Sequence, residues 1–126
     1  MIHRTFDQMK GTPNFAEADG FVSARLAVAS DNLGFTVTEA IGSPEIDLEV
    51  EHKNHIEAVY VIEGTGTVEI IETGEKYKLE PGVFYCFDKH ERHRYQLDTE
   101  VRAIAIFNPP LVGDEVNDAS GGYSAE

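Results

Sequence analysis

The chain has 126 residues, the length of one domain, which is enough to bury an ordinary hydrophobic core. Its 23 Asp and Glu residues against 10 Lys and Arg give a formal net charge of −13 at pH 7, which argues against nucleic acid or an anionic membrane as a partner. The single cysteine, Cys86, excludes an intrachain disulfide, and with no apolar signal core and no span of roughly 20 apolar residues the sequence predicts a cytoplasmic protein.

The first third of the chain alternates short elements with turn formers. Residues 5–10 predict a short helical turn that ends at Gly11. An alternating pattern over residues 21–28 predicts a strand whose one face is made of Phe21, Ser23, Arg25 and Ala27. A guanidinium among small neighbours can bind a carboxylate through two hydrogen bonds, although a solvated strand arginine is commoner. A turn at 31–34 and a second predicted strand at 35–41 follow.

The densest group of potential ligands is His52, His55 and Glu57, just before a β-branched run. In a strand that begins at His55, the period of two points His55 and Glu57 to one face. The sequence Gly64-Thr65-Gly66 predicts the turn of a hairpin, and residues 67–71 its return strand. These side chains therefore predict a metal site at the mouth of the hairpin.

A second group of donors follows a predicted strand at 76–79. Tyr85 lies in the middle of a predicted strand at 83–87, and His93 opens another at 93–97 after a polar turn. Imidazole, carboxylate and phenolate are nitrogen and oxygen donors that suit a divalent metal such as iron or zinc. His3 and His90 are expected to be solvated surface residues.

The last predicted strand, residues 101–107, places Ala103, Ala105 and Phe107 on one face, where small side chains leave room for a ligand. Many short strands with Gly and Pro punctuation predict an all-β fold, a single-domain barrel or jelly roll over residues 1–126. Residues 108–126 are rich in turn formers and predict either a frayed tail or a lid that brings Glu115 to the site.

Several motifs carry a resemblance to known proteins. Glu57 lies seven residues before Gly64, and His93 follows Pro81-Gly82, as in the two motifs of the cupins, although Val50 stands where cupins have their first histidine. Read together, the whole set resembles the ectoine synthase family over nearly the full length: Met1-Ile2-x-Arg4, Ser23-x-Arg25-Leu26, the run from His55 to Glu69, Pro81-Gly82, Tyr85, His93 and Pro110-Leu111-x-Gly113-x-Glu115-Val116.

This resemblance implies a cupin-type β-barrel that closes N-γ-acetyl-2,4-diaminobutyrate to ectoine with loss of water, a hydro-lyase reaction. It implies a head-to-tail homodimer and an iron held by residues that fall here on Glu57, Tyr85 and His93. Catalytic roles fall on Arg25, His55 and Glu115. The expected substrate contacts are the following: Phe21, Ser23, Arg25, Thr38, Ala40, His52, Ala105, Phe107 and Asn117.

Five of these positions depart from the family's usual residues. This chain has Phe21 where the family usually has Trp, Ala40 where it has Thr, His52 where it has Tyr, Ala105 where it has Cys, and Asn117 where it has His. Because losing one polar contact to a buried ligand costs about 1–3 kcal/mol, the departures predict weak ectoine synthase activity or a somewhat different substrate.

Three hypotheses follow for the chemistry. In the first, a metal polarises the acetamide, His55 or Glu115 moves the proton, and Arg25 anchors the substrate carboxylate. In the second, His52 and His93 join Glu57 in a two-histidine, one-carboxylate set, which serves another lyase, cyclase or oxygenase. In the third, the barrel binds a solute without turning it over.

Overall fold

The computed structural model describes residues 1–115, and it is built almost wholly of short β-strands. In chain order the elements are α1 (Phe6–Met9), β1 (Phe15–Ala18), β2 (Phe21–Ala27), the 3-10 turn η1 (Ala29–Asp31), β3 (Thr36–Gly42), β4 (Glu49–Val50), β5 (Ile56–Glu63), β6 (Gly66–Ile70), β7 (Lys76–Leu79), β8 (Phe84–Cys86), β9 (His93–Leu97) and β10 (Val101–Asn108). This confirms the predicted all-β fold. Across the described residues no helix is long and apolar enough to cross a membrane.

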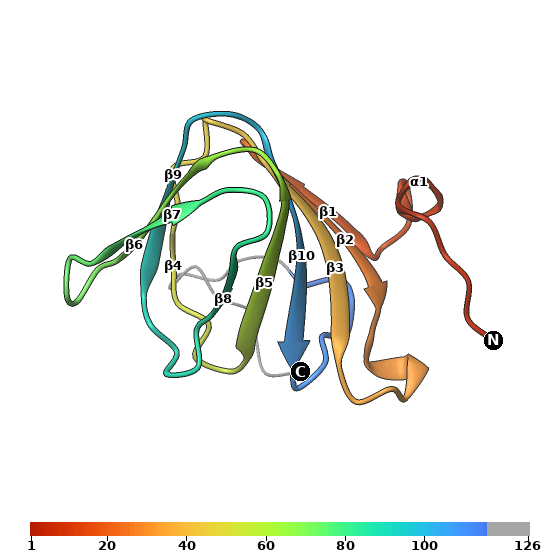
Figure 1. Ribbon diagram of the computed structural model, residues 1–126. Helices are drawn as coiled ribbons and strands as arrows, with labels where there is room; N and C mark the ends of the chain where they lie inside the picture. The colour runs from red at the N-terminus through yellow and green to blue at the C-terminus, as the bar shows by residue number, and fades with distance from the viewer. Residues whose placement is uncertain (116–126) are drawn as a thin grey trace.

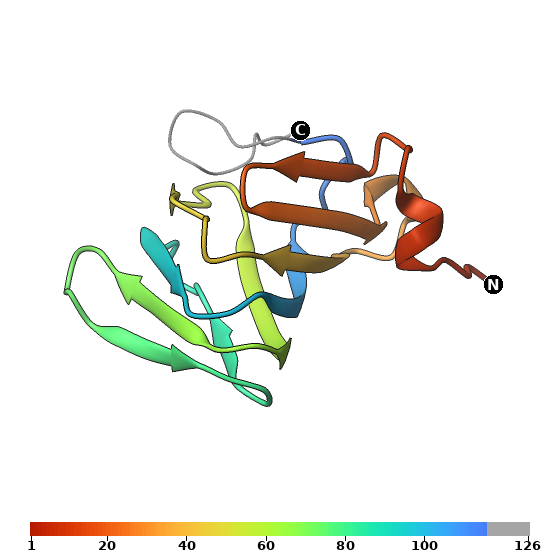
Figure 2. The same cartoon turned by 90° about the horizontal axis from the view of Figure 1, so that it is seen from above.

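The strands form two antiparallel sheets. The larger has the order β1-β2-β3-β10-β5-β8, and the smaller has the order β4-β9-β6-β7. Figure 1 shows β5 and β10 side by side at the centre of the molecule, with the smaller sheet to one side. In the view from above, the β6–β7 hairpin and the β1–β2 hairpin lie on opposite sides (Figure 2). The inner faces of the two sheets therefore share one interior.

The predicted strand faces are confirmed on β5 and β10. Val59 and Val61 of β5 are buried, whereas Tyr60 and Ile62 between and after them are exposed. On β10, Ala103, Ala105 and Phe107 are buried, and Ile106 is exposed. The period of two works here because one face of each strand packs against the interior while the other faces solvent.

Two short strands were not predicted. β1 pairs with β2 across a turn at Gly20, whose φ is +77°, and β4 pairs with β9 over two residues. A Cβ on Gly20 would also collide with the main chain of Ile46. Both strands exist because a partner strand accepts their hydrogen bonds, which the local sequence does not encode.

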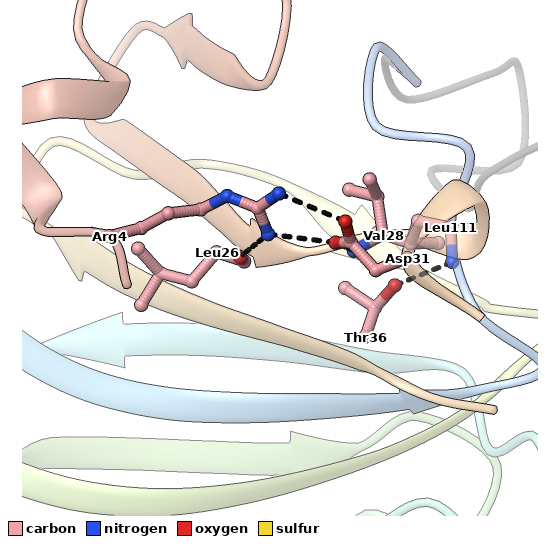
Figure 3. Close-up of polar contacts among 6 residues, drawn as sticks. All are labelled: Arg4, Leu26, Val28, Asp31, Thr36 and Leu111. Atoms are coloured by element: carbon pink, nitrogen blue, oxygen red, sulfur yellow. Dashed lines mark hydrogen bonds and ion pairs between the residues drawn. The ribbon is translucent and has the colours of Figure 1, made fainter. Parts of the chain in front are cut away.

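The chain after β10 packs against η1 and β3. The main-chain N–H of Leu111 donates to Thr36 Oγ1 at 2.7 Å, and its carbonyl accepts from Ala29 N at 2.7 Å. Leu111 is fully buried. Figure 3 shows this contact beside the bidentate pair of Arg4 and Asp31. Residues 116–126, and with them the predicted contact Asn117, lie outside the described residues.

Candidate active site

A cavity lies between the two sheets. The space that the centre of a water molecule can occupy in it has a volume of about 90 Å³. A single water needs only about 10–15 Å³ on this measure, so the space holds several waters or a small ligand. The walls carry most of the residues predicted for the site: Phe21, Ser23, Thr38, Ala40, His52, Glu57, Tyr85, His93, Ala105 and Phe107. Most of the predicted substrate contacts thus share one cavity with the three predicted metal ligands.

Strand register explains why the three predicted metal ligands share this cavity. Glu57 on β5 is paired with Phe107 of β10, and two residues further along β5 Val59 is paired with Tyr85 of β8. His93 belongs to β9 of the other sheet. The three side chains therefore come from neighbouring strands of one sheet and from the facing sheet, so closure of the barrel brings them together.

His93 has the orientation expected of a metal ligand. Its Nδ1 lies 2.9 Å from the carbonyl oxygen of Glu91, and because a carbonyl only accepts, Nδ1 carries the proton. Nε2 is buried and has no hydrogen-bond partner among residues 1–115. The ring stacks on Phe87 with centroids 3.7 Å apart and planes 5° apart. Ligating histidines are commonly fixed in this way, with one nitrogen donating to a carbonyl and the other presented to the metal.

Burial sets the charge of all three predicted ligands. It lowers the pKa of His93 to about 4, although the hydrogen bond to the Glu91 carbonyl and the charge of Glu91 act to raise it. The imidazole is therefore neutral at neutral pH. Burial raises the pKa of Glu57 to about 8. Burial also raises the pKa of Tyr85 well above its usual value, although the Tyr95 hydroxyl, 3.0 Å away, acts in the opposite direction. A bound cation would favour the charged forms of the carboxyl and the phenol, so this donor set fits a divalent metal.

The alternative set of His52, His93 and Glu57 is not assembled. Within the part of the chain that the structure describes, no three His, Cys, Asp or Glu side chains converge in a way that could hold an ion. His52 Nε2 lies 3.5 Å from Glu57 Oε1, but the His52 and His93 rings are 6.4 Å apart between centroids. Tyr85, whose phenol lies outside that set, lines the same cavity as Glu57 and His93.

Arg25, His55 and Glu115 do not line the cavity. They form a second group, in which Arg25 bonds to the main chain of Glu115 and the charge of Glu115 acts on His55. His55 is 2% exposed, and its ring contacts Phe107 at 6.1 Å between centroids. Burial lowers the pKa of His55, an effect that the charge of Glu115 partly offsets. A neutral imidazole beside a carboxylate is suited to accept a proton.

Arg25 has partners that sequence reasoning did not anticipate. Its guanidinium donates to Ser23 Oγ at 3.1 Å, to the carbonyl of Gly113 at 2.8 Å and to the carbonyl of Glu115 at 2.7 Å. The Glu115 carboxylate in turn accepts from the N–H groups of Val112 and Gly113 at 2.6 and 2.7 Å. Two residues predicted to be catalytic thus hold the segment after β10 in place.

Three further residues at the site carried no recognisable signal in the sequence. Phe87 stacks on His93, and Tyr95 contacts the Tyr85 hydroxyl. His90, expected to be solvated, is half-buried, and its Nδ1 lies 2.8 Å from the carbonyl of His52. Each acts on a residue that is distant in sequence or on another strand, so only the folded structure reveals it.

Known proteins match this chain along its whole length. The sequence profile of the family "Ectoine synthase" matches residues 1–126. The L-ectoine synthase of Mycolicibacterium vanbaalenii is 42% identical, over 99% of this chain and 96% of that protein. The L-ectoine synthase of Sphingopyxis alaskensis is 41% identical, over 100% of this chain and 92% of that protein.

Solved structures agree with the sequence matches. The crystal structure of ectoine synthase from P. lautus superposes with a TM-score of 0.87 at 35% identity, over 96% of this chain and 87% of that one. An RmlC-like cupin from Shewanella frigidimarina shares the fold, with a TM-score of 0.67 at 18% identity over 84% of this chain and 88% of that one. The cupin-type barrel predicted from the sequence is thereby confirmed. This chain belongs to the ectoine synthase family, a family of hydro-lyases.

Proposed function

We propose that this cavity closes N-γ-acetyl-2,4-diaminobutyrate to ectoine with loss of water. The observation that carries the proposal is the placement of Glu57, Tyr85 and His93 on one cavity, with the buried His93 Nε2 presented without a hydrogen-bond partner among the described residues. The family matches supply the reaction class.

Glu57, Tyr85 and His93 would hold one divalent metal ion, iron or zinc, because they offer a carboxylate, a phenolate and a neutral imidazole. When bound, such an ion supplies Lewis-acid polarisation of the substrate's acetamide oxygen. The stacking of Phe87 and the hydrogen bond to Glu91 fix the His93 ring before any ion arrives, which reduces the cost of ordering this ligand.

In the proposed ring closure, the substrate's α-amine attacks the acetamide carbon. A C–N bond forms, the carbon–oxygen bond of the acetamide breaks, and the two protons lost by the neutral amine leave with that oxygen as water. His55 is the better candidate to take the proton and return it to the departing hydroxyl, since burial keeps its imidazole neutral. Glu115 is engaged by two main-chain N–H groups, and its charge stabilises the imidazolium that forms on His55.

The remaining predicted contacts shape the pocket. Ser23 and Thr38 offer hydroxyl groups, while Phe21, Ala40, Ala105 and Phe107 make the wall largely apolar. Arg25 is proposed to anchor the substrate carboxylate. Because Arg25 and His55 lie outside the cavity wall, both proposed roles require the substrate to reach beyond that wall. The hydrogen bonds of Arg25 to Gly113 and Glu115 couple its proposed contact to the position of residues 109–115, the described part of the predicted lid.

We also propose a homodimer in the cytoplasm. The outer face of the larger sheet carries large exposed apolar side chains on three adjacent strands: Tyr60, Ile62, Phe84 and Ile106. Phe84 is 65% exposed and is paired with Tyr60 across β8 and β5. A contiguous apolar face of this kind is typical of a protein interface.

The reaction is tested by mass spectrometry of N-γ-acetyl-2,4-diaminobutyrate after incubation with protein loaded anaerobically with Fe²⁺ or with Zn²⁺. We expect a product lighter by one water from the wild type and far less of it from His55→Gln, which removes the proposed base but leaves the metal ligands intact. Absence of the product from wild-type protein that carries metal would contradict the proposed function.

A further inference from the structure

His90 sits in the turn between β8 and β9 with an unusual backbone conformation. Its φ is +56°, and among the non-glycine residues at positions 1–115 only Asn32 shares a positive φ. The main-chain N–H of His90 donates to the carbonyl of Phe87 at 3.3 Å, which closes the turn. Histidine enters this left-handed region more readily than most residues, so the backbone conformation alone assigns His90 no role, and any role must come from the contacts of its ring.

The ring of His90 joins this turn to the loop before β5. Its Nδ1 lies 2.8 Å from the carbonyl oxygen of His52 and 3.1 Å from that of His55. Both oxygens can only accept, so Nδ1 carries the proton and is shared between them. Neutral and charged imidazole can both carry a proton on Nδ1, so this bridge does not depend on a change of charge.

The two carbonyls belong to His52, whose side chain lines the cavity, and to His55, the proposed proton acceptor. His52 Nε2 lies 3.5 Å from Glu57 Oε1, and the His52 ring packs edge-on against Phe107 at 5.4 Å between centroids. His55 packs edge-on against the same Phe107 ring. A hydrogen bond that fixes the main chain at both ends of the loop restricts the direction of both side chains, as second-layer contacts do for catalytic groups elsewhere.

We propose that His90 is a positioning residue for ring closure. It acts by holding the carbonyls of His52 and His55. The inference rests on the proposed function of the cavity, because it assigns His90 a role in the rate of that reaction.

Two substitutions separate the ring from the backbone conformation. His90→Gly keeps a positive φ without strain but removes the donor. His90→Asn also tolerates the left-handed region and restores an N–H donor close to the position of Nδ1. We expect kcat for ring closure to fall about tenfold or more in His90→Gly, with a smaller change in KM, and to stay within about threefold of wild type in His90→Asn. His3→Asn, at an exposed histidine, is the matched control and should leave kcat unchanged.

An imidazole nitrogen NMR spectrum tests the bridge without any turnover. At a pH about two units above the ordinary imidazole value, the His90 signal, identified by its loss in His90→Asn, should report a proton on Nδ1. A proton on Nε2 instead, wild-type kcat in His90→Gly, or equal loss in His90→Asn and His90→Gly would each overturn the proposal. If wild-type protein makes no ectoine, the proposed function fails, and the NMR result still decides whether the bridge exists.

Discussion

The guanidinium of Arg25 on β2 donates a 2.7 Å hydrogen bond to the main-chain oxygen of Glu115, which lies 90 residues later in the chain. A second bond joins Arg25 to Gly113, so the buried guanidinium grips the segment after β10 at two points. The same segment places the Glu115 charge near His55. The strand that was predicted to bind substrate is therefore also the support of the segment that was predicted to close the site.

Arg25→Lys should loosen this segment and slow turnover. A lysine keeps the charge but loses the planar pair of donors, which leaves at least one buried carbonyl without its partner at a cost of about 1–3 kcal/mol. We expect kcat/KM to fall about tenfold and the amides of Val112 and Gly113 to exchange faster with deuterium. Arg102→Lys, at a half-exposed arginine on the outer face of β10, is the control. Unchanged exchange in Arg25→Lys would contradict the support role.

Acid stability should depend on Asp31. Two hydrogen bonds from Arg4, together with one from Val28 N–H, lower the pKa of Asp31 to about 2 (Figure 3). A carboxyl with a depressed folded-state pKa contributes stability above its unfolded pKa of about 3.9 and loses it as the pH falls through the folded value. The wild type should thus unfold at a higher urea concentration than Asp31→Asn. This difference in urea midpoint should be largest above about pH 5 and should shrink as the pH falls toward about 2. A difference that grows on acidification would contradict this, and Asp7→Asn at an exposed carboxylate serves as the control.

The departures from the family's usual pocket residues predict a gain of activity when they are reversed. Ala40 and His52 line the cavity, and Asn117 lies beyond the described residues. We expect the triple variant Ala40→Thr, His52→Tyr, Asn117→His to raise kcat/KM on N-γ-acetyl-2,4-diaminobutyrate about tenfold, which corresponds to about 1.4 kcal/mol of transition-state binding. If the wild type is already fast and the triple variant has no higher kcat/KM, the departures are neutral.

The apolar outer face of the larger sheet predicts the oligomeric state. Light scattering should give about twice the chain mass of 13.9 kDa. Phe84→Glu places a charge at the most exposed position of this face and should shift the protein toward monomer. Tyr77→Glu, at an aromatic residue of the smaller sheet that is 49% exposed, should leave the mass unchanged. A wild-type protein with the mass of a monomer at all concentrations would contradict the proposed dimer.

Local pattern was enough for the strands and for most of the cavity wall. β5 and β10 could be oriented because burial of one face imposes a period of two, and this placed Glu57, Val59, Ala105 and Phe107 on the inner side. Tyr85 and His93 could be predicted as site residues from the spacing of donor side chains after Pro81-Gly82. These features depend on neighbours within a few residues, which a sequence displays directly.

Contacts between distant segments could not be inferred in the same way. β1 and β4 depend on pairing with β2 and β9, and neither has a strong pattern of its own. The partners of Arg25 lie 88 and 90 residues away, and those of His90 lie 38 and 35 residues away. Only the closure of the barrel brings these groups within hydrogen-bond distance.

The central claim is that Glu57, Tyr85 and His93 bind one metal ion in this cavity. Elemental analysis after anaerobic loading with Fe²⁺ or Zn²⁺ and gel filtration tests it most directly. We expect about one ion per chain in the wild type and in Glu63→Gln, an exposed position on the same strand, and less than about a tenth of that in Glu57→Gln. Equal metal in Glu57→Gln and wild type, or none in the wild type with either ion, would contradict the account.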